Sequence, residues 1–272
     1  MAKRRGRKKG GAPDAVAGIL LTVLGLVLIA ALGGAAWWIK GIETSDPQTN
    51  CPPSGPKAVH LVIFDQSDPV SPQQAQRIRQ VMQQLKMAAQ VGDRFDIYSF
   101  EGDTRNVLEP RLVMCRPPEK ANEWIENVEK ARRRYEDFGR KLDAIVDELL
   151  KASTRPTSPI IESLRAASIT SFGPLSESKE IAFRVTLFSD MIQHSELCSH
   201  YRNDPDFGQL ARSAAWPSSR PDLKSAETEV FYLLRPDAKR AGGRAIQTRG
   251  HQNFWEQLLP AAGAQLRKIQ AF

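Results

Sequence analysis

Short apolar runs alternate with amphipathic segments along most of this chain. The apolar runs have the length of strands, and the amphipathic segments repeat apolar residues every three or four positions, as helices do. The predicted strands cover residues 59–64, 95–100, 112–114, 185–189, 229–234 and 266–269. The predicted helices cover residues 72–89, 119–151, 159–167, 206–214 and 254–262. This alternation predicts an α/β fold, a doubly wound and mostly parallel sheet with helices on both faces.

Residues 119–151 carry the longest amphipathic pattern and contain no proline. The spacing of the apolar residues alternates between four and three positions, which produces one continuous stripe on a helix. The stripe consists of Trp124, Val128, Ala131, Tyr135, Phe138, Leu142, Ile145 and Leu149. The pattern predicts one helix that packs this stripe on its own sheet. The alternative is a protruding helix that uses the stripe to bind a partner or a second copy of the chain.

A separate apolar run, residues 15–39, contains no charged residue. Because a membrane span needs about 20 apolar residues, this run is long enough to cross a bilayer as one helix. Six lysines and arginines precede it within residues 1–14, which predicts a cytoplasmic N-terminus and an extracytoplasmic C-terminal part. We therefore expect a single-pass protein of the inner (plasma) membrane. The alternative is a cleaved signal peptide, whose apolar core is usually shorter.

The formal net charge of +7 arises almost entirely from that N-terminal cluster. Without those six residues the chain is close to neutral, so the charge indicates membrane topology and no nucleic-acid partner is expected. Residues 40–57 contain four prolines, which is typical of an extended linker. The remaining residues, 58–272, form the predicted α/β domain.

Three cysteines, Cys51, Cys115 and Cys198, follow the apolar run. In an oxidising compartment two of them can form a disulfide, which leaves the third unpaired. The sequence is compatible with a Cys115–Cys198 bridge and with an intermolecular bridge through Cys51. It is equally compatible with three buried, unpaired thiols.

Polar side chains follow two of the predicted strands and open one of the predicted helices. Asp65 and Ser67 come after the first strand, and Asp190 comes after the fourth. Thr157 and Ser158 open the helix between them. Ligands of open parallel sheets bind at the carboxyl ends of the strands, so we expect these oxygens to converge. Oxygen ligands suit Mg²⁺ or Ca²⁺ better than a soft metal.

The arrangement resembles the von Willebrand factor A domain and its metal-ion-dependent adhesion site. That family places Asp-x-Ser-x-Ser after the first strand, a threonine at the start of a middle helix and an aspartate after the fourth strand. Asp65 and Ser67 match the first two positions, whereas Pro69 replaces the second serine. Ser158 takes the threonine position and Asp190 takes the last one.

Three further side chains are candidate ligands of this site. Thr157 is the alternative to Ser158, and Asp68 or Ser71 can substitute for the hydroxyl that is missing at position 69. The resemblance implies weak binding of Mg²⁺, or else of Mn²⁺ or Ca²⁺. It extends over residues 58–272 and implies six strands, with the first strand central and the third antiparallel at an edge.

The sequence contains neither a Gly-x-Ser-x-Gly elbow nor a Walker A loop. Phosphatases of the haloacid dehalogenase type need a second carboxylate where Ser67 stands, so a phosphatase-like hydrolase ranks low. The resemblance implies a membrane-anchored module that is not an enzyme and binds a protein partner, whose carboxylate completes the coordination of the cation. The alternative is a metal-independent structural subunit of an envelope assembly, joined through the anchor at 15–39 or the helix at 119–151.

Overall fold

The computed structural model describes residues 12–40, 45–100, 108–120, 127–151, 155–175, 181–240 and 242–272. Most of the basic segment expected at 1–14 therefore lies outside the described residues. The chain divides into two compact units, Met1–Thr44 and Ser45–Phe272.

The first unit contains a helix of 29 residues, α1 (Ala12–Lys40). Its central part, Ala17–Gly34, has a mean hydropathy of 2.4 and none of it is buried. Among the described residues, α1 is the helix that is long and apolar enough to cross a membrane. The span expected at 15–39 lies within this helix.

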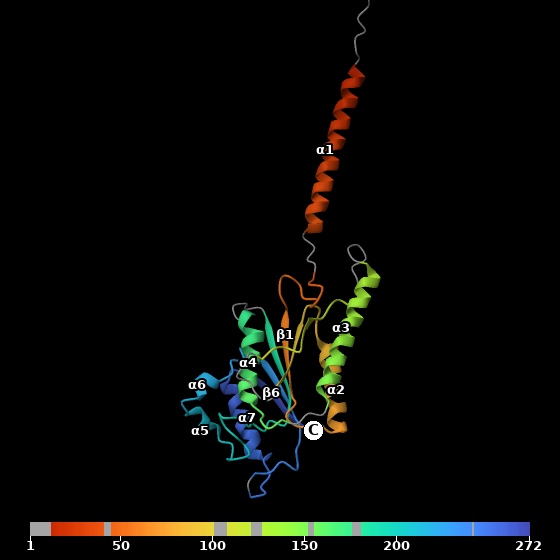
Figure 1. The fold of residues 1–272 in the computed structure, drawn as a ribbon. Helices are drawn as coiled ribbons and strands as arrows, with labels where there is room; N and C mark the ends of the chain where they lie inside the picture. The colour runs from red at the N-terminus through yellow and green to blue at the C-terminus, as the bar shows by residue number, and fades with distance from the viewer. Residues whose placement is uncertain are drawn as a thin grey trace, which may run out of the picture. The chain divides into compact units, whose positions relative to one another are not determined.

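The second unit is built on a six-stranded sheet (Figure 1). Its strands are β1 (Ala58–Asp65), β2 (Arg94–Phe100), β3 (Leu112–Cys115), β4 (Ala182–Ser189), β5 (Glu227–Tyr232) and β6 (Gln265–Ala271). The strand order is β3-β2-β1-β4-β5-β6, and every neighbouring pair is parallel except β2 and β3. The predicted fold class is confirmed, as are the central first strand and the antiparallel third strand at an edge.

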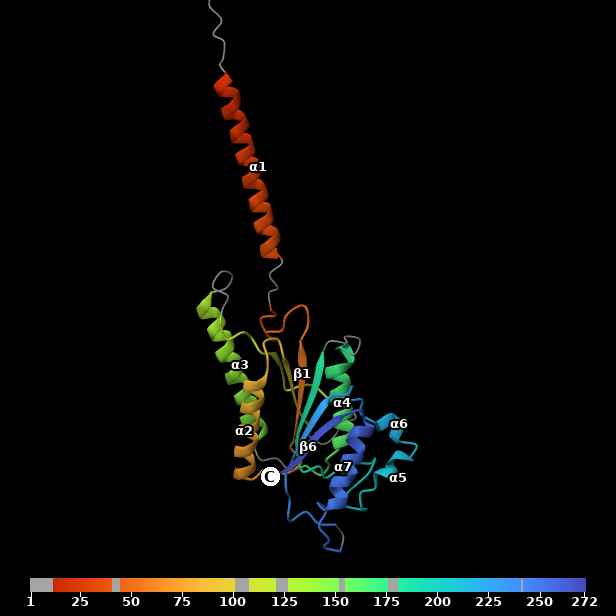
Figure 2. The same ribbon diagram turned by 180° about the vertical axis from the view of Figure 1, so that it is seen from behind.

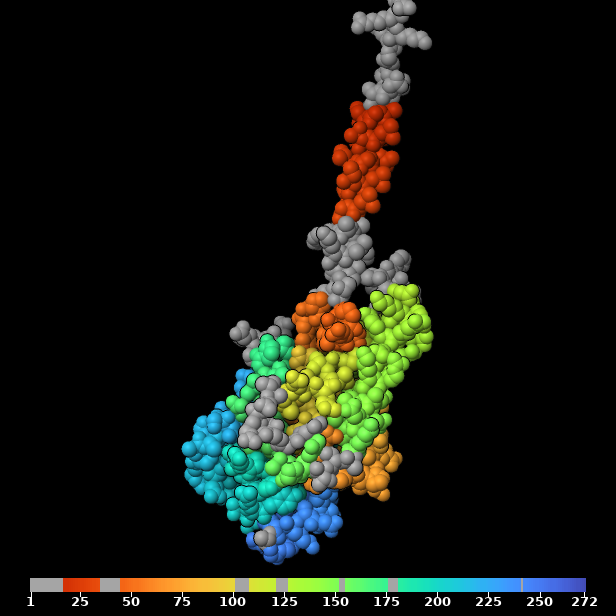
Figure 3. All heavy atoms as spheres, viewed as in Figure 1, coloured from red at the N-terminus to blue at the C-terminus, as the bar shows by residue number. Residues whose placement is uncertain are grey.

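Helices cover both faces of the sheet, as Figures 1 and 2 show from opposite sides. One layer holds α2 (Pro72–Ala88) and α3 (Val128–Leu149). The other holds α4 (Ile160–Phe172), α7 (Arg249–Ala261) and the short helices α5 (Phe207–Ala211) and α6 (Trp216–Ser219). In the space-filling view, α2 and α3 form one flank of this unit and the segment with α5 and α6 forms the other (Figure 3).

The side chains of β1 alternate between the two layers and fill both cores. Val59, Leu61 and Ile63 pack in the core beneath α4 and α7. Val62 and Phe64 pack in the core beneath α2 and α3. Because β1 has neighbours on both edges and both faces, all of its residues are buried. The end of this strand is therefore fixed by packing on both faces of the sheet.

The long helix α3 begins later than its apolar pattern predicts. The side chain of Asn127 caps it by accepting a hydrogen bond from the Lys130 N–H at 3.0 Å, so the expected start at Glu119 is wrong. The stripe residue Trp124 lies outside the described residues. The packing prediction is confirmed by Phe138, which is 1% exposed and whose ring lies 5.8 Å from that of Phe95.

Cys51 and Cys115 form a disulfide, and Cys198 is free. The alternative of a Cys115–Cys198 bridge is therefore wrong. The Cys115 N–H also donates to the carbonyl of Thr49 at 2.7 Å, so the chain before β1 runs against the edge strand β3. Residues 45–57, the larger part of the expected linker at 40–57, belong to the same compact unit as the sheet.

Candidate functional site at the strand ends

Asp65, Ser67 and Ser158 meet where β1 ends, as expected from their positions along the chain. The buried Asp65 carboxylate accepts a hydrogen bond from the Ser67 N–H at 2.9 Å and one from the Ser158 hydroxyl at 3.4 Å. A third hydrogen bond comes from the Ser189 hydroxyl at 2.7 Å, a partner that the sequence analysis missed. Burial raises the pKa of Asp65, and the hydrogen bonds from Ser189 and Ser67 oppose that rise.

Ser158 is held in place by the loop that follows β4. Its N–H and carbonyl exchange two hydrogen bonds with the backbone of His194, at 2.9 and 2.8 Å. In the same loop, the side chain of Gln193 accepts a hydrogen bond from the Ile161 N–H at the start of α4. The β4 loop therefore places the opening of α4 against the end of β1.

Asp190 lies at the end of β4 and is 2% exposed. One of its carboxylate oxygens accepts a hydrogen bond from the Ile192 N–H at 2.8 Å. Burial and the negative charge of the nearby Asp65 raise the pKa of Asp190, while the Ile192 hydrogen bond and the guanidinium of Arg235 oppose the rise. We call Asp65, Ser67, Ser158 and Asp190 the strand-end cluster.

Arg235 is the residue that the sequence analysis did not associate with this site. It follows β5, and its Nε lies 3.4 Å from Oδ2 of Asp190. Its Nη2 donates to the carbonyl of Asp68 at 3.2 Å and its Nη1 donates to the carbonyl of Pro69. The guanidinium therefore connects the ends of three parallel strands, and the side chain is 17% exposed. Its only sequence signal is its place in a basic loop, where arginines are usually solvated.

The strand-end cluster does not fit a divalent cation in this arrangement. Pro69 has no hydroxyl, and its carbonyl accepts a hydrogen bond from Arg235. Oδ2 of Asp190, a carboxylate oxygen of the kind that binds a hard cation, lies 3.4 Å from Nε of this guanidinium and so already has a cationic partner. Within the described ranges, no group of three acidic, histidine or cysteine side chains is arranged to hold a metal ion.

The three additional candidate ligands lie around the cluster in different ways. Ser71 caps α2, where its hydroxyl accepts a hydrogen bond from the Gln74 N–H at 3.2 Å. Thr157 lines a small hollow of about 240 Å³, together with Ser158 and Asp68. Asp68 accepts a hydrogen bond from Arg235 through its backbone carbonyl.

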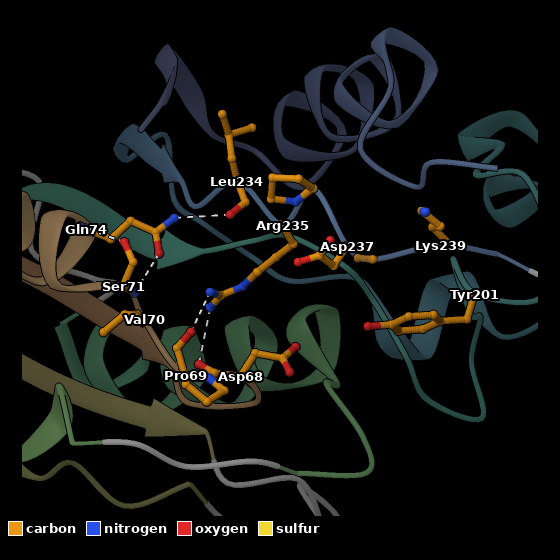
Figure 4. A pocket seen from close by; sticks show the side chains of 12 residues that line it. Asp68, Pro69, Val70, Ser71, Gln74, Tyr201, Leu234, Arg235, Asp237 and Lys239 are labelled. Carbon is orange, nitrogen blue, oxygen red and sulfur yellow. Dashed lines mark hydrogen bonds between the residues drawn. The ribbon is translucent and has the colours of Figure 1, made fainter. Parts of the chain in front are cut away.

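A larger hollow of about 820 Å³ opens beside the cluster, and we call it the strand-end hollow. Its walls come from the loops after β1, β4 and β5 (Figure 4). The lining consists of Asp68, Pro69, Val70, Ser71, Gln74, Tyr201, Leu234, Arg235, Pro236, Asp237, Ala238 and Lys239. Burial, together with the surrounding aspartates, raises the pKa of Tyr201 to about 12, so its hydroxyl remains a hydrogen-bond donor at neutral pH.

A buried chain of hydrogen bonds connects the β4 loop to β5 and α7. The Tyr232 hydroxyl bonds Nδ1 of His251 at 2.5 Å, and Nε2 of His251 bonds Nδ1 of His200 at 3.1 Å. Burial lowers the pKa of His251 to about 4 and that of His200 to about 2, so both rings are neutral. Trp255 adds a hydrogen bond from its indole N–H to the carbonyl of Met191 at 2.8 Å.

This chain of hydrogen bonds reaches Met191, a residue with a strained backbone. Met191, the residue after Asp190, has a φ of 59°, in the left-handed region that side chains other than glycine rarely adopt. The strain is held in place by the bonds around it, including a hydrogen bond from the Met191 N–H to the Ser189 hydroxyl at 2.7 Å. The orientation of Asp190 thus depends on packing that extends down to α7.

No family model and no curated protein match this sequence. Among solved structures, an aerotolerance-related membrane protein from Bacteroides fragilis is similar, with a TM-score of 0.40 and 14% identity, over 78% of this chain and 90% of that one. BatB, a conserved hypothetical protein from Bacteroides thetaiotaomicron, is similar with a TM-score of 0.41 and 12% identity, over 79% and 91%. For proximal thread matrix protein 1 from the mussel byssus, the TM-score is 0.32 and the identity 13%, over 65% of this chain and 38% of that one.

Proposed function

We propose that this protein is a membrane-anchored, extracytoplasmic interaction module that binds a protein partner at the strand-end hollow. The hollow is the observation that carries the proposal. It lies at the carboxyl ends of parallel strands, where open α/β sheets bind their ligands. Three separate loops form it, so its shape and charge depend on the fold as a whole.

The hollow exposes apolar and charged side chains together. Leu234 is 46% exposed, and the exposed prolines Pro69 and Pro236 also line the hollow. Asp237 and Lys239 add exposed charges of opposite sign. Surfaces that bind another protein commonly combine apolar and charged side chains in this way. We therefore expect a partner that presents an apolar side chain together with both an acidic and a basic group.

The module is proposed to act by binding and not by catalysis. Asp65, the acid after the first strand, is occupied by three hydrogen bonds from neighbouring groups. Ser67, at the position where a phosphatase of the haloacid type carries its second acid, takes part in this structural network through its backbone N–H. Both residues have a structural explanation in the described contacts.

Site-specific photocrosslinking of the full chain in membranes tests the proposal. A photoreactive amino acid at exposed Lys239 places the probe in the lining of the hollow, and the same amino acid at exposed Gln90 places it before β2, at the opposite end of the strands. We expect one discrete crosslinked protein from position 239, none from position 90, and loss of the product when Leu234→Asp is added.

A third probe separates this proposal from the alternative of a structural subunit. Arg133 lies on the exposed side of α3, which is covered by ion pairs such as Arg132–Glu136. Crosslinking from position 133 alone, with none from position 239, would move the functional surface to α3. Equal crosslinking from all three positions would show no preferred surface and would contradict the proposal.

A further inference from the structure

We propose that Arg235 is the resident cation of the strand-end cluster, so that the cluster is stable without a divalent cation and excludes one while the arginine is in place. The guanidinium then compensates the negative charge of the buried carboxyls, as a metal ion would at the same end of the sheet. Partner binding at the neighbouring hollow is then independent of divalent cations.

Arg235 contacts three oxygens of the kind that bind a hard cation. They are one carboxylate oxygen, from Asp190, and two backbone carbonyl oxygens, from Asp68 and Pro69. Carboxylate and carbonyl oxygens are also the ligands that Mg²⁺ and Ca²⁺ take in proteins. Each of the three guanidinium nitrogens contacts one of these oxygens.

Arg235 also brings positive charge to a buried, negatively charged cluster. Asp65 and Asp190 are both buried, and their charges act on each other. Buried charges need a partner because desolvation is costly. Among the described residues, Arg235 is the cation that forms an ion pair with this cluster, and its side chain is itself largely buried. A divalent cation that entered the cluster would meet a fixed positive charge in a site with little water to screen it.

Pro69 links the missing hydroxyl to the position of Arg235. A proline stands where the resemblance expects the second serine, so the cluster lacks one hydroxyl ligand. The carbonyl of the same Pro69 accepts a hydrogen bond from Arg235. Pro69 therefore both lacks a hydroxyl ligand and supplies an acceptor for Arg235. The missing hydroxyl and the arginine at the cluster thus have one common explanation.

Binding of Mn²⁺ to the purified full chain in detergent, counted by electron paramagnetic resonance, tests the inference. We expect no saturable Mn²⁺ site in the wild-type protein and one site in Arg235→Ala, which removes the charge and leaves space. Arg235→Lys is the matched control that keeps a cation and should bind no Mn²⁺. Adding Asp190→Asn to Arg235→Ala should abolish the new site.

Two outcomes would overturn the inference. One is a saturable Mn²⁺ site in the wild-type protein that is lost in Asp65→Ala. The other is a folded variant with a neutral residue at position 235 that gains no Mn²⁺ site. Arg235→Gln, which keeps hydrogen-bond donors for the carbonyls, serves as the second neutral variant if Arg235→Ala is unfolded by circular dichroism. The measurement contains no partner protein, so it can fail independently of the proposed function.

Discussion

Arg235 and Asp190 face each other across the strand-end cluster, with 3.4 Å between Nε and Oδ2. They come from neighbouring strands, β5 and β4, and both side chains are largely removed from water. A carboxylate in such a place is costly unless a cation or hydrogen bonds compensate it. The contribution of each residue to stability therefore depends on the presence of the other.

A double-mutant cycle measures this dependence. At a pH where Asp190 is ionised, Arg235→Met should lower the free energy of unfolding by about 3–5 kcal/mol, because it leaves the Asp190 carboxylate buried without its cation. In the Arg235→Met background, Asp190→Asn should restore at least about 1 kcal/mol, since the uncompensated charge is then removed. The measurement is urea unfolding of the detergent-solubilised chain, followed by tryptophan fluorescence. Strictly additive effects of the two substitutions would contradict the pairing.

Part of the candidate site could be predicted from the sequence, and the reason is geometric. Asp65 and Asp190 each follow a buried apolar strand, and parallel strands place their carboxyl ends at one edge of the sheet. Arg235 could not be found in this way. Its partners are separated from it by 45 or more residues, and its position depends on the path of the loop after β5. Local composition carries no information on such a path.

In the fold as well, sequence periodicity predicted some features, while others depend on individual contacts. Periodicity identified the buried face of α3 through Phe138 and Leu142, but the start of the helix depends on the cap at Asn127. The cap of α7 at Thr248 likewise moves its start ahead of the apolar residues that revealed the helix. Polar caps resemble loops in a sequence, so apolar spacing locates helix faces better than helix ends.

The Cys51–Cys115 disulfide should stabilise the second unit substantially. It joins residues 64 positions apart and attaches the segment before β1 to the edge strand β3. The chain-entropy model gives about 4 kcal/mol for a loop of this length. We expect Cys51→Ser with Cys115→Ser to lower the free energy of unfolding by about that amount, as measured by urea unfolding without reductant.

Cys198→Ser is the matched control for the disulfide prediction. Burial raises the pKa of the Cys198 thiol to about 12, so it stays protonated at neutral pH and does not exchange readily with the disulfide. The loss of stability should be much smaller than in the double variant, and added reductant should still destabilise the Cys198→Ser protein. Equal losses of unfolding free energy in both variants would show that the disulfide adds no specific stability.

Phe138→Ala should lower the free energy of unfolding by about 3–5 kcal/mol, because it leaves a cavity between α3 and the sheet. Phe138 is 1% exposed and packs near Phe95 and Met82 in one core. Val128 in the same helix is 57% exposed, so Val128→Ala should change stability by no more than about 0.5 kcal/mol. Unchanged melting of Phe138→Ala, together with a loss of self-association, would identify the stripe as an interface between chains.

The buried histidines should make the protein less stable in mild acid. Burial is the main reason that His200 and His251 are neutral. The charge of nearby Arg240 also lowers the pKa of both rings, and His251 lowers the pKa of His200 further. Their folded pKa values of about 2 and about 4 lie below the unfolded value of about 6.5. Between pH 6.5 and 4 the unfolded chain therefore binds protons that the folded chain does not. Each histidine then lowers the free energy of unfolding by up to about 1.4 kcal/mol per pH unit as the pH falls.

His251→Gln isolates this contribution from that of the buried carboxyls, whose raised pKa values act in the opposite direction. The slope of unfolding free energy against pH between 4.5 and 6 should fall by about 1.4 kcal/mol per unit relative to the wild type. Tyr232→Phe removes the hydroxyl that bonds His251 but keeps both imidazoles. It should lower stability at every pH and leave the slope as it is. An unchanged slope in His251→Gln would show that the ring is protonated in the folded state.

The second unit should lie outside the cytoplasm, with the N-terminus inside. Six basic residues precede the apolar run at 15–39, and positive charges of this kind are retained on the cytoplasmic side. The Cys51–Cys115 disulfide is consistent with this orientation, because structural disulfides persist in oxidising compartments. A reporter that is active only in the cytoplasm should therefore be inactive when fused after Phe272, whereas alkaline phosphatase at the same position should be active.

A charge-swapped variant is the control for this topology. Replacing the six basic residues with glutamine and adding three lysines directly after Lys40 reverses the charge asymmetry but leaves the apolar run intact. If charge sets the orientation, this variant should activate the cytoplasmic reporter in a large share of the molecules. Activity of that reporter in the wild-type fusion would contradict the predicted topology. It would also place the disulfide in a reducing compartment, where Cys51 and Cys115 would be expected as thiols.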